Sequence, residues 1–368
     1  MNRRQILQIV GLVFLSYGLA IAQTITTFEA PGAGNAAGQG TFAEGISLTG
    51  QTFGYYVDAS GVDHGFLRSQ GGAFTTFDAP GAGTATGQGT FGFSLSPSGV
   101  LVGYSIDSSG VMHGYERTTD GNFITIDAPG AGTSAGQGTF TYNINPAGTV
   151  AGFYFDATMV AHAYLRDPDG AFTIFDVPGA GTSAGQGTGT ASVIGLTATG
   201  KLTGPYIDSN NALHGYVRDS DSTITTFDAP GAGTGPGQGT DTAGLNPQGV
   251  IPGIAFDSNG AAHGFARAPN GTFITINVSG AGTASGQGTF AQGVNASDAI
   301  TGYMIDASSV AHGFVRANSG TITTFDAPGA GTAGGQGTFP LTNNPPGAIA
   351  GFVVDASGVS HGFVRSGS

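Results

Sequence analysis

The chain consists of short runs of alternating apolar and polar residues that return at a fixed interval. In the stretch 88–136, β-rich runs at 90–95, 100–106, 113–117 and 123–126 are each bounded by Gly, Pro, Asp or Ser. Such runs, separated by turn residues, are typical of strands, and no window outside the N-terminal segment has a helical period. The pattern predicts four short strands joined by hairpin-length turns, with a long glycine-rich loop leading into the next copy.

This pattern occurs seven times. Each of the seven histidines stands six residues after an aspartate and four before an arginine, and successive histidines are 49 residues apart five times and 52 once. Four antiparallel strands in each copy predict an all-β, seven-bladed β-propeller rather than a β-solenoid, which would need capped ends. The repeated triplets are Asp58, His64 and Arg68; Asp107, His113 and Arg117; Asp156, His162 and Arg166; Asp208, His214 and Arg218; Asp257, His263 and Arg267; Asp306, His312 and Arg316; and Asp355, His361 and Arg365.

The two ends of the repeat array predict how the ring closes. The last copy stops after its third strand, at 361–365, and an isolated fourth strand stands at 24–30. Pairing 24–30 into the blade formed by 338–365 would leave no blade with an unpaired edge. We therefore expect residues 23–368 to form one propeller domain.

The first 22 residues have the pattern of a secretory signal peptide. Arg3 and Arg4 precede an apolar run, and the small-x-small sequence Ala20-Ile21-Ala22 precedes Gln23. The run is too short for a good membrane span, and a retained anchor is the alternative. The chain has no cysteine, so it has neither a disulfide framework nor a lipid-attachment site. These features predict a secreted or periplasmic protein with no membrane association after cleavage near Ala22–Gln23.

The charge balance limits the possible partners. Ten Lys and Arg stand against 23 Asp and Glu, a net charge of −13, and removal of Arg3 and Arg4 gives −15. A surface of this sign repels nucleic acid and anionic lipid headgroups. The composition excludes nucleic acid as a partner.

The core of each copy carries a resemblance to a known family. The sequence is His-Gly-Phe at four copies, His-Gly-Tyr at His113 and His214, and His-Ala-Tyr at 162–164, with an Asn-rich run such as 143–148 upstream. Over the whole mature chain this resembles the extracellular HAF repeat proteins, named for a His-Ala-Phe core. It departs from them in carrying arginine where that family often has tryptophan. The resemblance implies a secreted, bacterial, propeller-like protein without an assigned activity.

The Asp/His/Arg triplets favour a structural role. Asp ends the second strand and His begins the third, so the two share one end of a hairpin. One carboxylate and one imidazole per copy are too few for zinc, and no nucleophile recurs beside them. We expect Asp to accept turn N–H groups and His to join neighbouring blades. We expect Arg to pair with the acid that ends the fourth strand, although a carboxylate-binding arginine ring is the alternative. Those acids are Glu29, Asp78, Asp127, Asp176, Asp228 and Asp326, and the seventh position is Asn277.

The long glycine-rich loop is the candidate for ligand binding. Glycine permits close backbone approach, and exposed N–H groups can hold a ligand. The loop lacks the lysine and the following helix of a phosphate loop. The alternative is that its recurring glutamine only satisfies loop backbone. The candidate ligand-binding residues are Gln39, Gln88, Gln137, Gln186, Gln238, Gln287 and Gln336.

Together these features predict a monomeric, non-enzymatic propeller with no cofactor and no metal. It would bind or scaffold a neutral glycan or another extracellular protein on its loop face. A propeller lyase or hydrolase is an alternative that needs residues breaking the symmetry. A calcium-stabilised module is another, but one acid per turn falls short of a calcium loop. The fourth copy has three extra residues within 189–203, which predict a bulge or a longer turn. The non-repeating ionisable residues are scattered over several copies: Glu44, Asp63, Glu116, Lys201 and Asp241.

Overall fold

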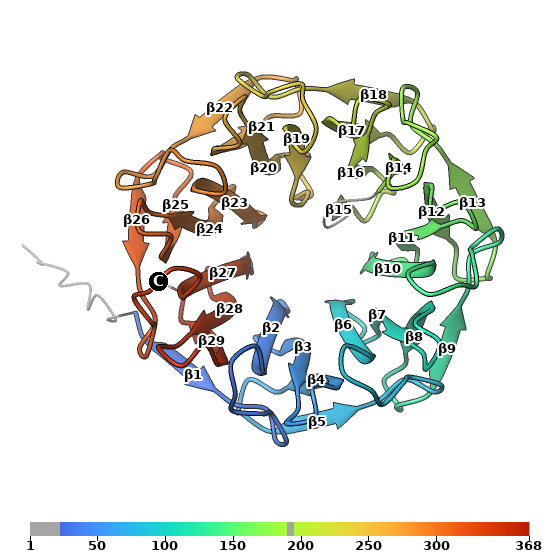
Figure 1. Cartoon of the computed structure of the whole chain (residues 1–368), viewed down its shortest axis with the longest axis horizontal. Helices are drawn as coiled ribbons and strands as arrows, with labels where there is room; N and C mark the ends of the chain where they lie inside the picture. The colour runs from blue at the N-terminus through green and yellow to red at the C-terminus, as the bar shows by residue number, and fades with distance from the viewer. Residues whose placement is uncertain (1–22, 190–194, 368) are drawn as a thin grey trace, which may run out of the picture.

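A computed structural model describes residues 23–189 and 195–367, which form a closed ring of seven β-strand units (Figure 1). The signal-peptide prediction falls on residues 1–22, which lie outside the described residues. In the part of the chain that is described, no helix is long and apolar enough to cross a membrane.

The units are numbered in chain order. Unit 1 comprises β2 (Gly40–Ile46), β3 (Thr52–Val57), β4 (Asp63–Arg68) and β5 (Phe74–Phe77). Unit 2 comprises β6 (Gly89–Leu95), β7 (Leu101–Ile106), β8 (Met112–Arg117) and β9 (Phe123–Ile126). Unit 3 comprises β10 (Gly138–Ile144), β11 (Val150–Phe155), β12 (Ala161–Arg166) and β13 (Phe172–Phe175). Unit 4 comprises β14 (Gly187–Thr188), β15 (Gly195–Leu196), β16 (Leu202–Ile207), β17 (Leu213–Arg218) and β18 (Ile224–Phe227).

The remaining units complete the ring. Unit 5 comprises β19 (Gly239–Thr242), β20 (Ile251–Phe256), β21 (Ala262–Arg267) and β22 (Phe273–Ile276). Unit 6 comprises β23 (Gly288–Val294), β24 (Ile300–Ile305), β25 (Ala311–Arg316) and β26 (Ile322–Phe325). Unit 7 comprises β27 (Gly337–Asn343), β28 (Ile349–Val354), β29 (Ser360–Arg365) and, from the other end of the chain, β1 (Ile25–Phe28).

The prediction of a seven-bladed β-propeller with four antiparallel strands per blade is wrong, because the units are not separate sheets. Strands are antiparallel within a unit, but the third strand of each unit also pairs in parallel with the first strand of the next, as β4 does with β6 at Asp63 and Gly89. All described strands therefore belong to one mixed sheet of 29 strands. Twenty-one of them close into a barrel and eight lie outside it. The all-β prediction is confirmed for the described residues.

The ring closes through both ends of the chain. β1 pairs antiparallel with β29, with Thr27 opposite Phe363, and β2 pairs in parallel with β29 at Gly40 and Ser360. The parallel pairing between neighbouring units requires glycine at the start of the first strand, as the junction between units 1 and 2 illustrates. Gly89 has φ +130°, and a Cβ there would lie 2.0 Å from the carbonyl oxygen of Asp63. Because L residues rarely adopt this φ and the space is filled by backbone, glycine begins the first strand of every unit.

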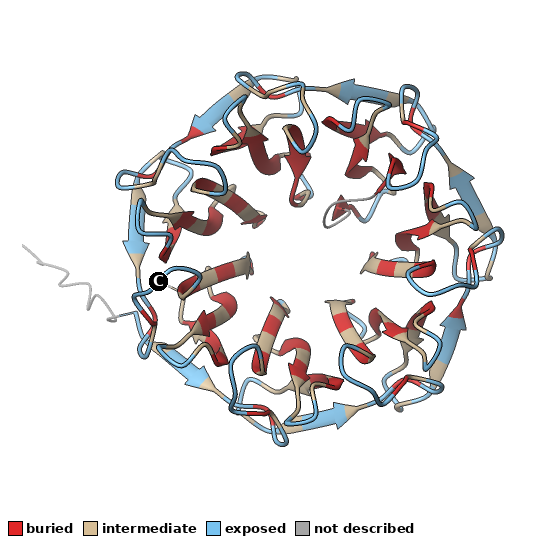
Figure 2. Cartoon of the chain, viewed as in Figure 1, coloured by how far each residue is buried: buried red, intermediate tan, exposed pale blue. Residues whose placement is uncertain are grey.

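The core lies in the inner three strands of each unit, and the outermost strands are exposed (Figure 2). The aromatic residue of the His-Gly-Phe core fills it in every copy. These rings are at most 2% exposed: Phe66, Tyr115, Tyr164, Tyr216, Phe265, Phe314 and Phe363. Burying large rings is the main source of stability in a chain without disulfides.

Unit 4 differs from the other units in its first strand. In place of a continuous strand it has the two-residue strands β14 and β15. Residues 190–194 between them lie outside the described residues, so the prediction of a bulge or longer turn falls partly on that stretch.

Candidate binding site between units

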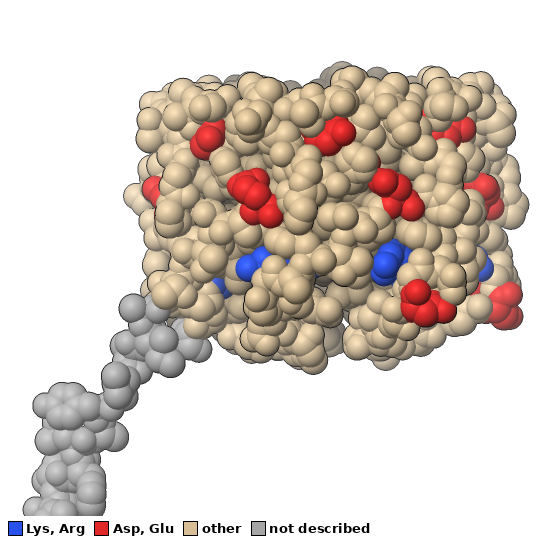
Figure 3. Space-filling view, turned by 90° about the horizontal axis from the view of Figure 1, so that it is seen from below, with Lys and Arg blue, Asp and Glu red and all other residues tan. Residues whose placement is uncertain are grey.

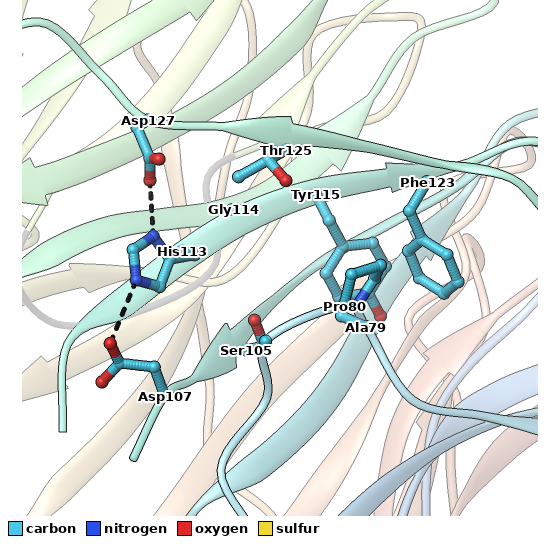
Figure 4. A pocket seen from close by; sticks show the side chains of 11 residues that line it. Ala79, Pro80, Ser105, Asp107, His113, Gly114, Tyr115, Phe123, Thr125 and Asp127 are labelled. Carbon is cyan, nitrogen blue, oxygen red and sulfur yellow. Dashed lines mark hydrogen bonds and ion pairs between the residues drawn. The ribbon is translucent and has the colours of Figure 1, made fainter. Parts of the chain in front are cut away.

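A histidine lies between two carboxylates in most units. In unit 2, Nε2 of His113 is 3.6 Å from Asp107 and Nδ1 is 2.9 Å from Asp127 (Figure 4). Asp107 follows β7, His113 is the second residue of β8, and Asp127 follows β9, so all three side chains belong to one unit. The expectation that His joins neighbouring blades is therefore wrong, because its second partner is the acid that ends its own outer strand.

The aspartate after the second strand organises the turn. Oδ1 of Asp107 accepts N–H bonds from Ser109 at 2.8 Å and Val111 at 2.9 Å. Burial acts to raise the pKa of Asp107, but these N–H donors and His113 outweigh it and hold the pKa below its usual value. The carboxylate therefore stays charged and fixes the position of the imidazole next to it.

The same arrangement recurs with small changes around the ring. In unit 5 the second partner of His263 is Asn277 at 3.3 Å, and in unit 7 the second partner of His361 is Glu29 from the N-terminal strand. The remaining histidines lie between aspartates: His64 between Asp58 and Asp78, His162 between Asp156 and Asp176, His214 between Asp208 and Asp228, and His312 between Asp306 and Asp326.

The repeat arginines do not pair with the acids that end the fourth strands. Those acids face the histidines, and five of the arginines instead lie over a phenylalanine of the preceding unit, as Arg117 does over Phe77. In the side view, acidic groups stand in rows around the outer wall, mostly above the arginines (Figure 3). The five stacked pairs are Arg68 on Phe28, Arg117 on Phe77, Arg218 on Phe175, Arg267 on Phe227 and Arg365 on Phe325.

The side-chain amides of the loop glutamines form hydrogen bonds with backbone groups. Oε1 of Gln137 accepts the N–H of Ser134 at 3.0 Å, and its Nε2 donates to the carbonyl of Ala157 at 3.1 Å. All seven glutamines make this pair of bonds, which ties the long loop to the second-to-third turn of the same unit. Because both amide atoms bond to backbone, these residues hold the geometry of the loop, and their role as ligand-binding groups stays a prediction.

The same loops also join one unit to the next. The N–H of Gly87 donates to the carbonyl of Gly61, in the turn of the preceding unit, at 2.8 Å. The hydroxyl of Thr90 accepts the N–H of Ala79 at 2.9 Å. Each residue of the Gln-Gly-Thr sequence therefore has a local structural role. Gln holds the loop, Gly allows the close parallel pairing with the preceding unit, and Thr accepts a hydrogen bond from the end of the preceding outer strand.

One inter-unit crevice forms a pocket of about 300 Å³ beside His113. Its polar wall is made by Ser105, Asp107, His113 and Asp127, and its apolar wall includes the ring of Phe123 (Figure 4). The backbone of 79–81, after the outer strand of unit 1, closes the other side. Ser105 lies directly opposite His113 in the β7–β8 ladder, which places its small side chain at the pocket floor.

The exposure of the histidine varies with the residue opposite it. In units 1, 3 and 4 a tyrosine stands there and stacks on the imidazole, with ring centroids 4.9 to 5.1 Å apart. The histidine side chains are 20 to 23% exposed in those units, but His113 is 34% exposed and His263, which faces Ala255, is 37% exposed. The tyrosines are Tyr56, Tyr154 and Tyr206.

The free space between the neighbouring loop and the residue opposite the histidine also differs between units. A Cβ on Gly32 would lie 3.3 Å from the hydroxyl of Tyr56, whereas a Cβ on Gly81 or Gly231 would meet nothing within 4 Å. Gly81 lines the pocket together with Ser105. The sequence pattern predicts a structural role for Asp107 and His113 and a pairing of Asp127 with arginine, and it does not single out Ser105, Tyr115 or Phe123. Aligning the seven copies would have drawn attention to Ser105, because three of the other copies have tyrosine at this position.

The pocket offers hydrogen-bond acceptors and an aromatic face. Among the described residues, no group of three or more His, Cys, Asp and Glu is arranged to hold a metal ion. The arrangement is suited to binding a ligand rich in donors.

Sequence comparisons identify no relative: no family model matches the chain, and no curated protein matches it. Solved structures do match. The BP39L lectin from Burkholderia pseudomallei has a TM-score of 0.57 and 12% identity, covering 88% of this chain and 95% of that chain. Puromycin hydrolase has a TM-score of 0.50 and 14% identity, covering 87% of this chain and 51% of that chain.

These likenesses show the fold alone, because the identities are low. The chain shares its ring-shaped, propeller-like β architecture with a lectin over nearly the whole of both chains, and with about half of a hydrolase. The architecture is therefore compatible with a binding protein and does not by itself separate binding from catalysis.

Proposed function

We propose that this protein is a secreted, non-enzymatic ring that binds a neutral glycan, and that its main site is the crevice at Ser105. The observation that carries the proposal is the pocket of about 300 Å³ in which Ser105 stands where three other units have tyrosine. A saccharide unit combines hydroxyl donors with an apolar C–H face, and the pocket provides matching partners for both.

The charges of the site favour a neutral ligand. Asp107 and Asp127 can accept hydroxyl hydrogens, and together they would repel a carboxylate or sulfate. The apolar face of a sugar ring can pack on Phe123, which is half-buried at the pocket wall. The acidic composition of the chain acts in the same direction.

Repeated binding would use the equivalent positions of other units. Ala255 and Val353 occupy the position of Ser105 in units 5 and 7, and each is smaller than tyrosine. Unit 5 has Asn277 and unit 7 has Glu29 as the second partner of histidine, so these sites differ from that of unit 2. Weak sites on one rigid ring gain affinity when a ligand or surface engages several of them.

The test is a glycan array with the purified protein, followed by titration of the best neutral saccharide by calorimetry. Ser105→Tyr places in unit 2 the residue that units 1, 3 and 4 already accommodate, and it should weaken binding at least about tenfold. Ser105→Ala, which keeps the pocket open, is the matched control and should bind within a few-fold of the original. The converse variant Tyr154→Ser should increase the number of sites.

Two outcomes would overturn the proposal. The first is a folded protein that binds no glycan on the array, which would favour an extracellular protein as the partner. The second is unchanged binding by Ser105→Tyr with its fold verified by circular dichroism.

A further inference from the structure

A second cavity lies on the axis of the ring, away from the crevices of the outer wall. It has a volume of about 100 Å³, and its lining includes Glu44, Phe93, Tyr142, Gln292 and Thr342. These residues come from units 1, 2, 3, 6 and 7, and side chains from so many units can meet only at the centre.

β-bulges direct these side chains inward. The register of the first and second strands shifts at Ala43/Gly45, at Gly92/Ser94, at Thr141/Asn143 and at Ala291/Gly293. The residues within these four shifts are Glu44, Phe93, Tyr142 and Gln292. A bulge re-aims the side chain of its extra residue and is frequent beside binding sites. The position is also the least uniform in the repeat, since Glu, Phe, Tyr and Gln occupy it in turn.

Glu44 supplies an unneutralised acid to this cavity. No ion pair found among the described residues includes it, and burial raises its pKa to about 7. Its charge also acts to raise the pKa of Tyr55, Tyr104 and Tyr142. The cavity therefore favours a positive charge.

An aromatic cluster lies next to the acid. The rings of Phe93 and Tyr142 have centroids 4.9 Å apart, and both lie near Tyr104, at 5.3 and 6.2 Å. The faces of such rings attract cations, most strongly where water is excluded. On the opposite side, the hydroxyl oxygen of Thr342 is buried and has no hydrogen-bond partner. It is a polar atom that an N–H donor could satisfy.

We infer that the axial cavity binds a small organic ammonium ion, with Glu44 as its counter-ion, Phe93 and Tyr142 as its aromatic wall and Thr342 as a hydrogen-bond acceptor. An ammonium group matches all three features: its charge meets the carboxylate, one N–H meets the orphaned hydroxyl, and its methyl or methylene part meets the rings. A hydrated metal ion has no methyl or methylene part to pack against the rings. The inference is independent of the glycan proposal, since the two sites share no residue.

The test is calorimetric titration of the whole protein at pH 8 with methylammonium, and with potassium as the inorganic cation. We expect saturable methylammonium binding that potassium at equal concentration does not displace. Glu44→Gln keeps the shape of the side chain and should weaken binding at least about tenfold. Thr342→Val should weaken it by a smaller factor. Asp120→Asn removes the same charge from an exposed turn and should leave binding unchanged.

Three results would overturn the inference. The absence of saturable methylammonium binding would exclude the site. Equal binding by Glu44→Gln, with the fold verified by circular dichroism, would show that the carboxylate is not its counter-ion. Competition by potassium at equal concentration would reduce the effect to ordinary counter-ion association.

Discussion

The guanidinium carbon of Arg117 lies 4.8 Å from the centroid of the Phe77 ring, which belongs to the preceding unit. The repeat arginine therefore joins units, which is the task the sequence had suggested for histidine. Arg166 and Arg316 lack such a ring because the preceding unit has isoleucine at the position of Phe77. These residues are Ile126 and Ile276 respectively. Arg166 instead binds Glu116 of the neighbouring unit at 2.7 Å.

Removing one such stack should weaken the ring measurably. In a double-mutant cycle of Arg117→Met and Phe77→Leu, we expect a coupling free energy of about 1 kcal/mol, because the guanidinium is partly shielded from water. Denaturant unfolding provides the measurement. The matched cycle of Arg316→Met and Ile276→Leu should give a coupling near zero, and equal coupling in both cycles would disprove the assignment.

The loop glutamines should prove to be stabilising residues. Gln137 is buried, and Gln137→Ala leaves the N–H of Ser134 and the carbonyl of Ala157 without partners. We expect a loss of about 1–3 kcal/mol in the free energy of unfolding. Gln70→Ala, at an exposed position, serves as the control and should change little. A folded Gln137→Ala protein of unchanged stability that no longer binds glycan would instead restore the glutamine to the binding site.

Acid should destabilise the protein through its seven turn aspartates. The folded-state pKa of each is below its usual value, as hydrogen bonds from turn N–H groups outweigh the effect of burial. A depressed pKa contributes stability above the unfolded-state value and loses it as pH falls through the folded-state value. The melting temperature should therefore drop steeply below roughly pH 4. Asp107→Asn should make this dependence shallower, and a flat profile down to pH 3 would contradict the assignment.

The buried acid on the axis should act in the opposite sense. The folded-state pKa of Glu44 is raised to about 7, so the stability of the protein should fall as pH rises from about 4.5 to 7 and the carboxyl ionises in a site that disfavours charge. Glu44→Gln should therefore raise the melting temperature at pH 8 and leave it nearly unchanged at pH 4.

Glu44 acts on the phenols of Tyr55, Tyr104 and Tyr142, which stay protonated in this range. Asp63, which acts on Tyr55 and Tyr104, also has its pKa raised to about 7. Asp63→Asn combined with Glu44→Gln separates the two carboxyls. A Glu44→Gln protein with the same melting temperature as the original at pH 8 would show that this carboxyl is well solvated.

Local features of the fold were predictable because strands are encoded by neighbouring residues. The four runs read in the second copy match β6, β7, β8 and β9 within one residue at nearly every boundary. The bonds from Asp107 to its turn also follow from spacing alone, because donor and acceptor are at most four residues apart. The candidate site was predictable only in part. The pocket beside His113 contains the small residue Ser105, and its importance is recognised only when it is compared with the tyrosines at the same position in other units, Tyr56, Tyr154 and Tyr206.

The sequence by itself determined the number of units, the strands of each and the polar groups that recur at each turn, since all of these follow from the order of residues within one copy. Only the tertiary structure decided which residues meet across units. The parallel pairing of Asp63 with Gly89, the stack of Arg117 on Phe77 and the meeting of Glu44 with Thr342 all depend on how the ring closes. Residue spacing fixes distances along a strand, whereas distances between units are set by packing.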